Sequence, residues 1–293
     1  MALRIATRGT PLARWQAERV ATLLGDDAEL VVVTTSGDAR PDTPIAAMGG
    51  TGVFVKEVEV AVLDGRADVA VHSAKDLPSS IPPDGLVLAA FPERADARDA
   101  LVGSTLAALA PGAVVATGSV RRRAQLAAVH PQLEFAELRG SIGTRLDRAS
   151  EFAAIVVAAA ALERLGLLDR ATEVLDPSVM IPQVGQGALA VECRADDHDT
   201  FARVSTINDL AVARAVTAER AFLEGLAGGC DLPCGAYAIV DGDEIVLQGV
   251  LASVDGHTVL RGTERGDDPD LVGRTLVREL LDGGGTELIE AAR

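Results

Sequence analysis

Hydrophobic positions fall into short apolar runs separated by segments with helical spacing, and this alternation occurs in two successive blocks. The apolar runs predict strands at 3–6, 30–35, 68–72, 113–116, 133–138 and 154–158, and the helical segments lie at 12–24, 53–63, 119–130 and 141–149. Thr10 and Pro11 suit the N-cap and first turn of the first helix. Such alternation is typical of a parallel sheet flanked by helices. The pattern therefore predicts an α/β fold.

The two blocks resemble each other at one turn. Segment 5–9 (IATRG) and segment 115–119 (VATGS) each end a strand and lead directly into a helix. We interpret the blocks as two doubly wound lobes with a cleft between them, and chance similarity of so short a segment is the alternative. A strand-like run at 188–192 is predicted to return to the first lobe.

The C-terminal part has a different pattern. Strands are predicted at 236–240, 244–251 and 257–261, after a helix at 208–226 and before one at 269–282 that ends at three glycines. The strands are joined at Asp-Gly dipeptides, which are typical of hairpin turns. This predicts a small α+β domain with a three-stranded antiparallel sheet. The predicted domains are 1–91 with 186–205, then 92–185, then 206–293.

Composition narrows the classes of function. The chain has 293 residues, 27 basic and 43 acidic side chains, and a formal charge of −16. This charge argues against nucleic-acid binding, which depends on neutralising phosphates, and 3% aromatic residues argue against base stacking. The longest apolar run, 152–162, is shorter than the roughly 20 residues that cross a bilayer. With no apolar N-terminal signal and three cysteines, the sequence predicts a cytoplasmic protein without membrane or nucleic-acid partners.

Several familiar cofactor motifs are missing or out of place. Lys56 and Lys75 are the only lysines, and neither lies in a Gly-Lys-Ser/Thr phosphate loop. Segment 185–190 has the spacing of a dinucleotide fingerprint but precedes a predicted strand instead of following one. Cys193 and His198 alone are weak grounds for a metal site. The sequence therefore predicts neither a nucleotide cofactor nor a metal.

Arginines and small polar residues gather at predicted strand-to-helix turns. These turns are 8–10 (RGT), 117–123 (TGSVRRR) and 139–145 (RGSIGTR). Ligands of α/β sheets bind beyond the carboxyl ends of strands, where helix N-termini attract anions and arginine forks bind carboxylates or phosphates. Three such turns predict a site for a ligand with several negative groups. The alternative is a set of solvated arginines at helix starts.

Two further segments carry reactive groups. Strand 68–72 leads into segment 72–76 (HSAKD), so Asp76 is a candidate general acid or base, or a carboxylate that stabilises a developing cation. A surface Lys-Asp pair is the alternative. Cys230 lies in a glycine-bounded loop, where an accessible thiolate is a strong nucleophile. A buried inert thiol and a disulfide with Cys234 are the alternatives.

These motifs, in this order, resemble the porphobilinogen deaminase (hydroxymethylbilane synthase) family over nearly the whole chain. The segments that carry the resemblance are 4–8 (RIATR), 15–17 (WQA), 54–57 (FVKE), 70–76 (AVHSAKD), 138–140 (LRG), 143–146 (GTRL), 184–188 (VGQGA) and 228–230 (GGC). The His-Ser-x-Lys-Asp run and the Gly-Gly-Cys loop together are highly specific.

The resemblance implies a transferase of tetrapyrrole (porphyrin) biosynthesis. Its first two domains resemble the lobes of type II periplasmic binding proteins, and its third presents Cys230, whose thiol carries a dipyrromethane cofactor through a thioether. Such an enzyme joins four porphobilinogen units head to tail, releases ammonia at each step, and frees hydroxymethylbilane by hydrolysis. The implied partners are this substrate and product, with transient hand-over to the next enzyme, and we expect a monomer.

The resemblance also implies roles for individual residues. Asp76 is catalytic, because a carboxylate near the pyrrole nitrogens stabilises the cation formed when ammonia leaves. The residues implied to hold the cofactor are Ser73, Lys75, Thr117, Ser119, Arg121, Arg122 and Arg145. Those implied for the substrate and growing chain are Arg8, Thr10, Gln16, Arg139 and Arg164. Each unit brings an acetate and a propionate, so an arginine-rich site suits it.

Three positions depart from the family pattern. Thr10 replaces a usual serine and keeps the hydroxyl, whereas Gly118 removes a hydroxyl from the cofactor turn. Thr51 replaces a common lysine in segment 36–52, which is predicted as a loop long enough to form a lid. The alternative function is a two-lobe protein that binds or senses a small anion without catalysis. That alternative leaves the Gly-Gly-Cys loop unexplained.

Overall fold

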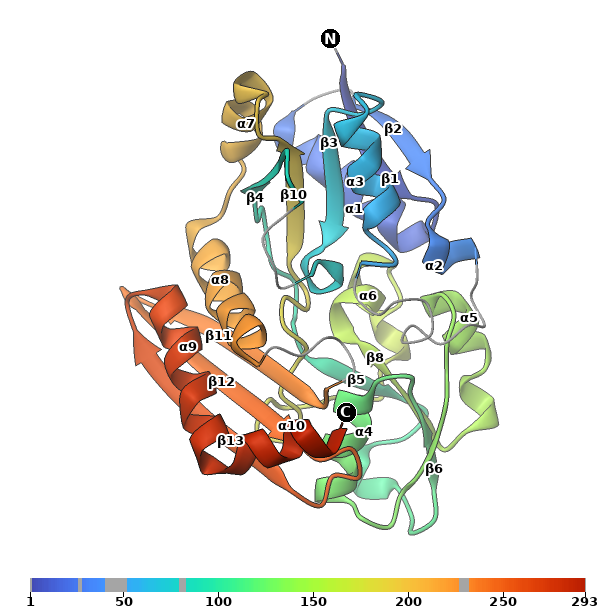
Figure 1. The fold of residues 1–293 in the computed structure, drawn as a ribbon. Coiled ribbons are helices and arrows are strands. Elements are labelled where there is room, and N and C mark those ends of the chain that lie inside the picture. Colours follow the sequence, from blue (N-terminus) through green and yellow to red (C-terminus); the bar gives the residue numbers. More distant parts are fainter. Residues whose placement is uncertain (1, 26–27, 40–51, 79–82, 227–231, 293) are drawn as a thin grey trace. The chain divides into compact units, whose positions relative to one another are not determined.

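The computed structural model describes residues 2–25, 28–39, 52–78, 83–226 and 232–292 (Figure 1). The chain divides into two compact units. Unit 1 comprises Met1–Ala95 and Gly187–Ala213, and unit 2 comprises Asp96–Gln186 and Arg214–Arg293. Among the described residues, unit 1 holds a five-stranded sheet, and unit 2 holds a five-stranded and a three-stranded sheet.

Unit 1 is built on a sheet with the strand order β2-β1-β3-β10-β4. Its elements are β1 (Leu3–Arg8), α1 (Pro11–Leu24), β2 (Ala28–Val33), α2 (Ser36–Ala39), α3 (Lys56–Leu63), β3 (Val69–Ser73), β4 (Leu86–Ala90), β10 (Leu189–Arg194) and α7 (His198–Ser205). β1, β2 and β3 are parallel, whereas β10 pairs antiparallel with β3 and β4. The predicted return of 188–192 to the first lobe is confirmed.

Each face of this sheet packs against a different helix. Ile5 and Val71 lie in the same core cluster as Val20 of α1. Ala6, the next residue along β1, lies in the cluster that contains Val58 of α3. Because successive strand residues point to opposite faces, α1 and α3 cover opposite faces, and the doubly wound prediction is confirmed.

The five-stranded sheet of unit 2 has the order β7-β6-β8-β5-β9. Its elements are β5 (Asp99–Val102), β6 (Val114–Ala116), α4 (Val120–Val129), β7 (Glu134–Ala136), α5 (Ile142–Asp147), β8 (Ala154–Ala158), α6 (Ala159–Arg164) and β9 (Glu173–Val174). Leu126 of α4 packs in one core cluster with Val115, and Leu146 of α5 packs in another with Ala116. Helices therefore cover both faces here too.

The two five-stranded sheets share one arrangement. Each has three adjacent parallel strands, then a reversed strand (β10 or β5), then an edge strand. β1 and β6 occupy equivalent positions in the two orders. The resemblance between segments 5–9 and 115–119 therefore lies at equivalent strand ends.

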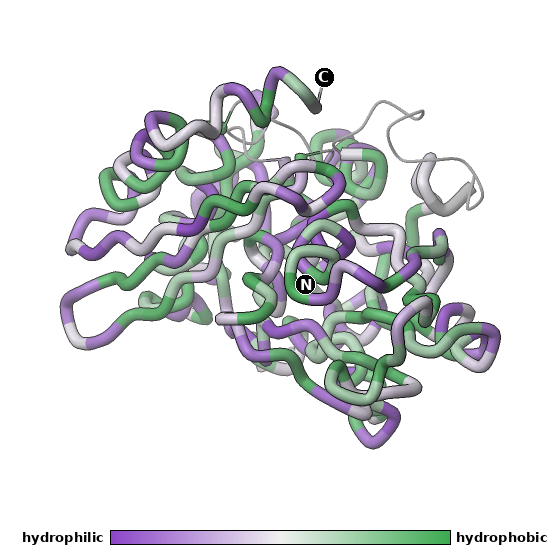
Figure 2. Tube along the Cα trace, turned by 90° about the horizontal axis from the view of Figure 1, so that it is seen from below, coloured by the Kyte–Doolittle hydropathy of each residue, from purple (hydrophilic) through white to green (hydrophobic). Residues whose placement is uncertain are grey.

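The C-terminal part of unit 2 is the predicted α+β arrangement. β11 (Cys234–Asp241), β12 (Glu244–Ala252) and β13 (Val259–Gly266) form an antiparallel sheet, and α8 (Leu210–Gly225) and α9 (Pro269–Leu280) accompany it. Phe222 and Leu276 share a buried core with β11 and β12. Gly249 leaves room for them, since a Cβ there would lie 2.7 Å from the Phe222 ring. Figure 2 shows hydrophobic stretches along strands and hydrophilic stretches at many turns.

One expectation is wrong. The five-stranded sheets are mixed instead of parallel, because β10 and β5 run against their neighbours. The predicted helix 269–282 corresponds to α9 and breaks at the glycines, where the chain kinks at Gly284 (φ 107°), but a further helix that was not predicted, α10 (Thr286–Ala292), follows. The division into three domains and the cleft between the first two stay predictions. No helix within the described ranges is long and apolar enough to cross a membrane.

Candidate active site

The carboxyl end of β1 carries two of the predicted site residues. Thr10 is the N-cap of α1, and its Oγ1 accepts a hydrogen bond from the backbone N–H of Ala13 at 3.3 Å. Pro11 follows in the first turn, as predicted. The guanidinium of Arg8 lies over the ring of Phe54, 4.2 Å from the centroid. This cation–π contact orients Arg8 at the strand end.

The carboxyl end of β3, which neighbours β1, carries Ser73, Lys75 and Asp76, the last two on a 3-10 turn. Gln16 of α1 is buried and donates from Nε2 to Ser73 Oγ at 2.7 Å. Arg8 Nη1 lies 4.0 Å from Asp76 Oδ2. β1 and β3 are adjacent and parallel, so their carboxyl ends meet at one edge. The structure therefore brings four of the predicted site residues together in two pairs.

Arg8 and Asp76 form a loose ion pair. Their 4.0 Å separation is longer than a hydrogen bond, and the side chains remain 21% and 29% exposed. The carboxylate thus lies beside a positive charge and still faces solvent, where an N–H donor of a ligand can reach it. Such a carboxylate can stabilise a cation that forms on the ligand, and the guanidinium can bind the ligand's own carboxylate.

The opposite face of β3 carries a buried charge cluster that sequence reasoning missed. His72 Nε2 lies 3.1 Å from Glu192 Oε2 of β10, and both side chains are buried. Glu59 of α3 is also buried. Burial raises the pKa of Glu59 and the charge of Glu192 raises it further, while His72 acts in the opposite direction without cancelling them. Two carboxylates therefore share one imidazole beneath the site.

In unit 2, Thr117 and Ser119 lie at the turn between β6 and α4. Thr117 is buried, and its Oγ1 accepts a hydrogen bond from the Ser119 N–H at 3.2 Å. Ser119 is the predicted N-cap of α4, and its Oγ accepts from the Arg122 N–H at 3.5 Å. Gly118 lies between them, and a Cβ there would be 3.1 Å from the Leu138 carbonyl oxygen. The close approach of that carbonyl oxygen leaves little room for the hydroxyl that Gly118 lacks.

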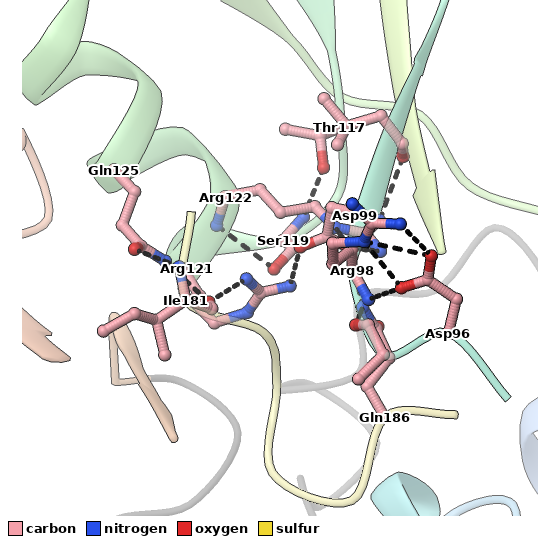
Figure 3. Close-up of polar contacts among 12 residues, drawn as sticks. Asp96, Arg98, Asp99, Thr117, Ser119, Arg121, Arg122, Gln125, Ile181 and Gln186 are labelled. Atoms are coloured by element: carbon pink, nitrogen blue, oxygen red, sulfur yellow. Dashed lines mark hydrogen bonds and ion pairs between the residues drawn. The ribbon is translucent and has the colours of Figure 1, made fainter. Parts of the chain in front are cut away.

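Arg121 and Arg122 are buried, and both bind the carboxylate of Asp99 (Figure 3). Arg121 Nη2 donates to Asp99 Oδ2 at 2.8 Å, and Arg122 Nη2 donates to Oδ1 at 2.7 Å. Gln186 Nε2 donates to the same Oδ1 at 2.8 Å. Burial alone would raise the pKa of Asp99, but the charges of both arginines and the Gln186 hydrogen bond hold this pKa well below its usual range. Asp99 is therefore an ionised, fully buried anchor.

This cluster fits an anionic cofactor group. One carboxylate stands against two guanidiniums, so the three side chains carry a net positive charge. Arg121 Nε is buried and has no hydrogen-bond partner among the described residues. A buried donor in a positively charged cluster suits a carboxylate. The described residues contain no group of three or more His, Cys, Asp or Glu side chains arranged to hold a metal ion.

Two of the remaining predicted arginines make contacts within their own segments. Arg139 Nε donates to Glu137 Oε1 at 2.6 Å. Arg145 Nε donates to the Gly140 carbonyl oxygen at 2.9 Å. Arg164 lies at the end of α6 and is buried. The Asp99 cluster therefore gathers Arg121 and Arg122 from the predicted set.

Cys230 lies outside the described residues, as does Thr51 with most of the predicted loop 36–52. The description resumes at Leu232, and Cys234 is buried at the start of β11. At the next residue, Gly235, a Cβ would lie 2.5 Å from the Pro182 carbonyl oxygen and 2.9 Å from Arg121 Cδ. The strand that follows the Cys230 loop therefore packs directly against Arg121.

The segment around Gln186 is a structural connection. Gly185 (φ 70°) and Gly187 (φ 85°) adopt left-handed backbone conformations. The Gly185 N–H donates to Glu219 Oε2 at 2.7 Å, and Glu219 Oε1 accepts from the Ala238 N–H at 2.8 Å. This buried carboxylate of α8 thus ties the segment to β11. Segment 184–188 was recognised in the sequence as a family motif. Nothing in the sequence around Asp99 or Glu219 indicated that these residues bind it.

Comparisons with known proteins show the family of this chain. Residues 3–202 match the family model described as the dipyromethane cofactor binding domain of porphobilinogen deaminase, and residues 213–282 match its C-terminal domain. The porphobilinogen deaminase of Roseiflexus castenholzii is 47% identical over 98% of both chains, and that of Roseiflexus sp. strain RS-1 is 48% identical over 98% of both. Among solved structures, the Bordetella pertussis BvgS periplasmic VFT2 domain has a TM-score of 0.41 at 16% identity, over 70% of this chain and 86% of that one. The chain belongs to the porphobilinogen deaminase family.

Proposed function

We propose that this chain joins four porphobilinogen units head to tail, releases ammonia at each step, and frees hydroxymethylbilane. The units are added to a dipyrromethane cofactor that is bound through a thioether to Cys230. The observation that carries the proposal is the pairing of Arg8 with Asp76 at the edge of the unit 1 sheet, in a chain of this family. A cation-stabilising carboxylate beside an anion-binding guanidinium is what this substrate requires.

Asp76 is the proposed catalytic residue. Porphobilinogen loses ammonia and leaves a positive charge shared by its ring N–H. The part-exposed carboxylate of Asp76 can accept that N–H and stabilise the charge as it develops. Arg8 binds an acetate or propionate of the same unit, and Phe54 keeps its guanidinium in place. Gln16 and Ser73 orient each other next to this pair.

The cofactor, when bound, supplies the primer to which the substrate units are joined. The residues proposed to hold its carboxylates are Ser73, Lys75, Thr117, Ser119, Arg121, Arg122 and Arg145, and the net charge and buried Arg121 Nε of the Asp99 cluster support this. Thr10, Arg139 and Arg164 are proposed to bind the incoming substrate and the growing chain.

The test is the intact mass of freshly purified, denatured protein. We expect wild type to carry a covalent increment of two linked pyrrole units, and Cys230→Ser to lack it. The matched control is Cys234→Ser, which removes the neighbouring thiol and should keep the increment. A wild-type chain that is unmodified, and gains no mass with porphobilinogen, would overturn the proposal and favour a binding or sensor protein.

We also propose that the enzyme works in the cytoplasm as a monomer and passes its product transiently to the next enzyme. Size-exclusion chromatography with light scattering measures the oligomeric state, and a stable dimer would contradict the monomer.

A further inference from the structure

Asp99 occupies a special place in the unit 2 sheet. It is the first residue of β5, which runs antiparallel to β8, and it pairs with Ala158 at the carboxyl end of that strand. A reversed strand begins where parallel strands end, so its first side chain lies at the edge where α4 starts. Asp99 is fully buried there. From this position the Asp99 carboxylate reaches Arg121 and Arg122 of α4.

Asp99 fixes each arginine in a defined direction. Arg122 donates from Nε and Nη2 to Oδ1, while its Nη1 donates to the Val156 carbonyl oxygen at 2.9 Å. Arg121 donates from Nη2 to Oδ2, while its Nη1 donates to the Ile181 carbonyl oxygen at 2.6 Å. Charge-assisted bonds of this kind set orientation as well as energy. The two guanidiniums would otherwise repel each other.

Arg121 also connects this cluster to the strand that follows Cys230. Gln125 lies one helical turn later on α4. Its Nε2 donates to the Ile181 carbonyl oxygen at 3.0 Å, and its Oε1 accepts from the Ile181 N–H at 2.9 Å. Gly235 of β11 packs against the Ile181 and Pro182 carbonyl oxygens and against Arg121 Cδ. The path from Asp99 through Arg121 to β11 is therefore a continuous run of contacts within unit 2.

We propose that Asp99 is a positioning residue for cofactor attachment: it holds Arg121 and Arg122 in the directions in which they bind the cofactor's carboxylates, with Arg121 packed against β11. This rests on the proposed function, in which Cys230 carries the cofactor. The proposal gives Asp99 no part in turnover, because it is fully buried, with Oδ1 accepting from Arg122 and Gln186 and Oδ2 accepting from Arg121.

The test separates loading from turnover. Intact mass gives the loaded fraction of Asp99→Asn, and product formation is then measured per loaded molecule. We expect loading to fall about tenfold, the lower end of the loss seen when a partner that orients a binding residue is removed. Turnover per loaded molecule should stay within about twofold of wild type, since uniform loss of holding interactions leaves the chemical step unchanged.

Three further variants keep the test decisive. Asp96→Asn is the matched control, because Asp96 lies three residues away and pairs with Arg98 at 2.6 Å without touching Arg121. Asp99→Glu retains the charge and should load better than Asp99→Asn. Gly235→Ala leaves the charges intact and should reproduce the loading defect through β11. Loading is measured on the folded fraction from size-exclusion chromatography. If Asp99→Asn does not fold, the loading of Asp99→Glu and Gly235→Ala tests the positioning role.

The outcomes are distinguishable. Full loading in folded Asp99→Asn, or in Gly235→Ala, overturns the positioning role. Full loading with lost turnover overturns it too, since Asp99 would then act in the reaction. Equal defects in Asp99→Glu and Asp99→Asn would show that the carboxylate charge is not what positions the arginines. If wild type and Asp96→Asn also carry no cofactor, it is the proposed function that fails.

Discussion

The two five-stranded sheets share a strand order but treat buried charge in opposite ways. In each sheet the reversed strand supplies a buried carboxylate, Glu192 on β10 and Asp99 on β5. Glu192 and Glu59 share one imidazole, that of His72. Asp99 alone faces two guanidiniums. The first cluster has a surplus of carboxylates, and the second has a surplus of cations.

The groups at the carboxyl edges differ in the same way. Arg8 and Asp76 in unit 1 are part exposed and 4.0 Å apart. The buried pairs of unit 2 are 2.7 and 2.8 Å long. A loose, solvated pair can adjust to a substrate that changes at each step, whereas a tight buried cluster suits a group that stays attached. Under the proposed function, the chemistry is assigned to unit 1 and the permanent anchor to unit 2.

The largest expected effect is on the chemistry of unit 1. Asp76→Asn keeps the shape of the side chain but removes the charge that stabilises the developing cation. We expect product formation per loaded molecule to fall by about 10²–10³-fold, as for loss of a single electrostatic stabiliser. Single-turnover kinetics on protein of known cofactor content measure this.

Asp84→Asn serves as the control, since Asp84 is an exposed carboxylate of the same unit. It should change the rate by less than about twofold, because an exposed distant charge is largely screened. If the Asp76→Asn enzyme turns over as fast as this control, Asp76 does not stabilise the developing cation. The assignment of the chemistry to unit 1 would then be wrong.

The second prediction compares two Arg→Gln changes. Arg122→Gln leaves buried Asp99 with one guanidinium and should lower the free energy of unfolding by about 3 kcal/mol, the cost of breaking a buried ion pair. Arg8→Gln removes a part-exposed cation and should cost less than about 0.5 kcal/mol. Urea unfolding measures both, in a Cys230→Ser background so that the cofactor does not contribute.

Arg8→Gln should have its main effect on activity, which is measured with Cys230 present. Arg8→Gln is expected to raise KM, because Arg8 is proposed to bind a substrate carboxylate at the unit 1 edge. Equal stability losses for the two variants would remove the distinction between a solvated site and a buried anchor.

Local signals in the sequence were enough to predict the helix starts. Thr10, Ser119 and Ser141 each accept a hydrogen bond from the backbone of the first turn, and each lies at or just before the start of a predicted helical segment. The edge that unites Arg8 with Asp76 was also predictable, because both follow strands and parallel strands share a carboxyl edge. These inferences need only residues close in sequence plus one rule of sheet geometry.

The buried carboxylates could not be predicted in this way. Asp99 is one of 43 acidic residues, and its meaning depends on β5 lying beside β8 and α4. The direction of β5 and β10 could not be predicted either, because an apolar run looks alike in a parallel and an antiparallel strand. Glu192 lies within a run that only its pairing with His72 and β4 explains. Long-range pairing decides these features, and local patterns do not report it.

The smallest expected effect is a change in the free energy of unfolding at Glu59, opposite in sign to the change at Arg122. Because burial and the charge of Glu192 raise the pKa of Glu59, the folded chain holds this proton to higher pH than the unfolded chain does. Stability therefore falls as pH rises through the unfolded value of about 4.3. Glu59→Gln removes the penalty and should raise the free energy of unfolding at pH 7, the opposite sign to Arg122→Gln.

The gain should vanish below about pH 4, where Glu59 is protonated in both states. Urea unfolding at pH 7 and pH 4 measures it, with Glu18→Gln as the control, since Glu18 is exposed on α1. If Glu59→Gln is instead less stable at pH 7, the attraction of His72 for the Glu59 charge outweighs burial and Glu192. Both sheets would then hold their buried carboxylates by cations, and the surplus of carboxylates in unit 1 would carry no cost.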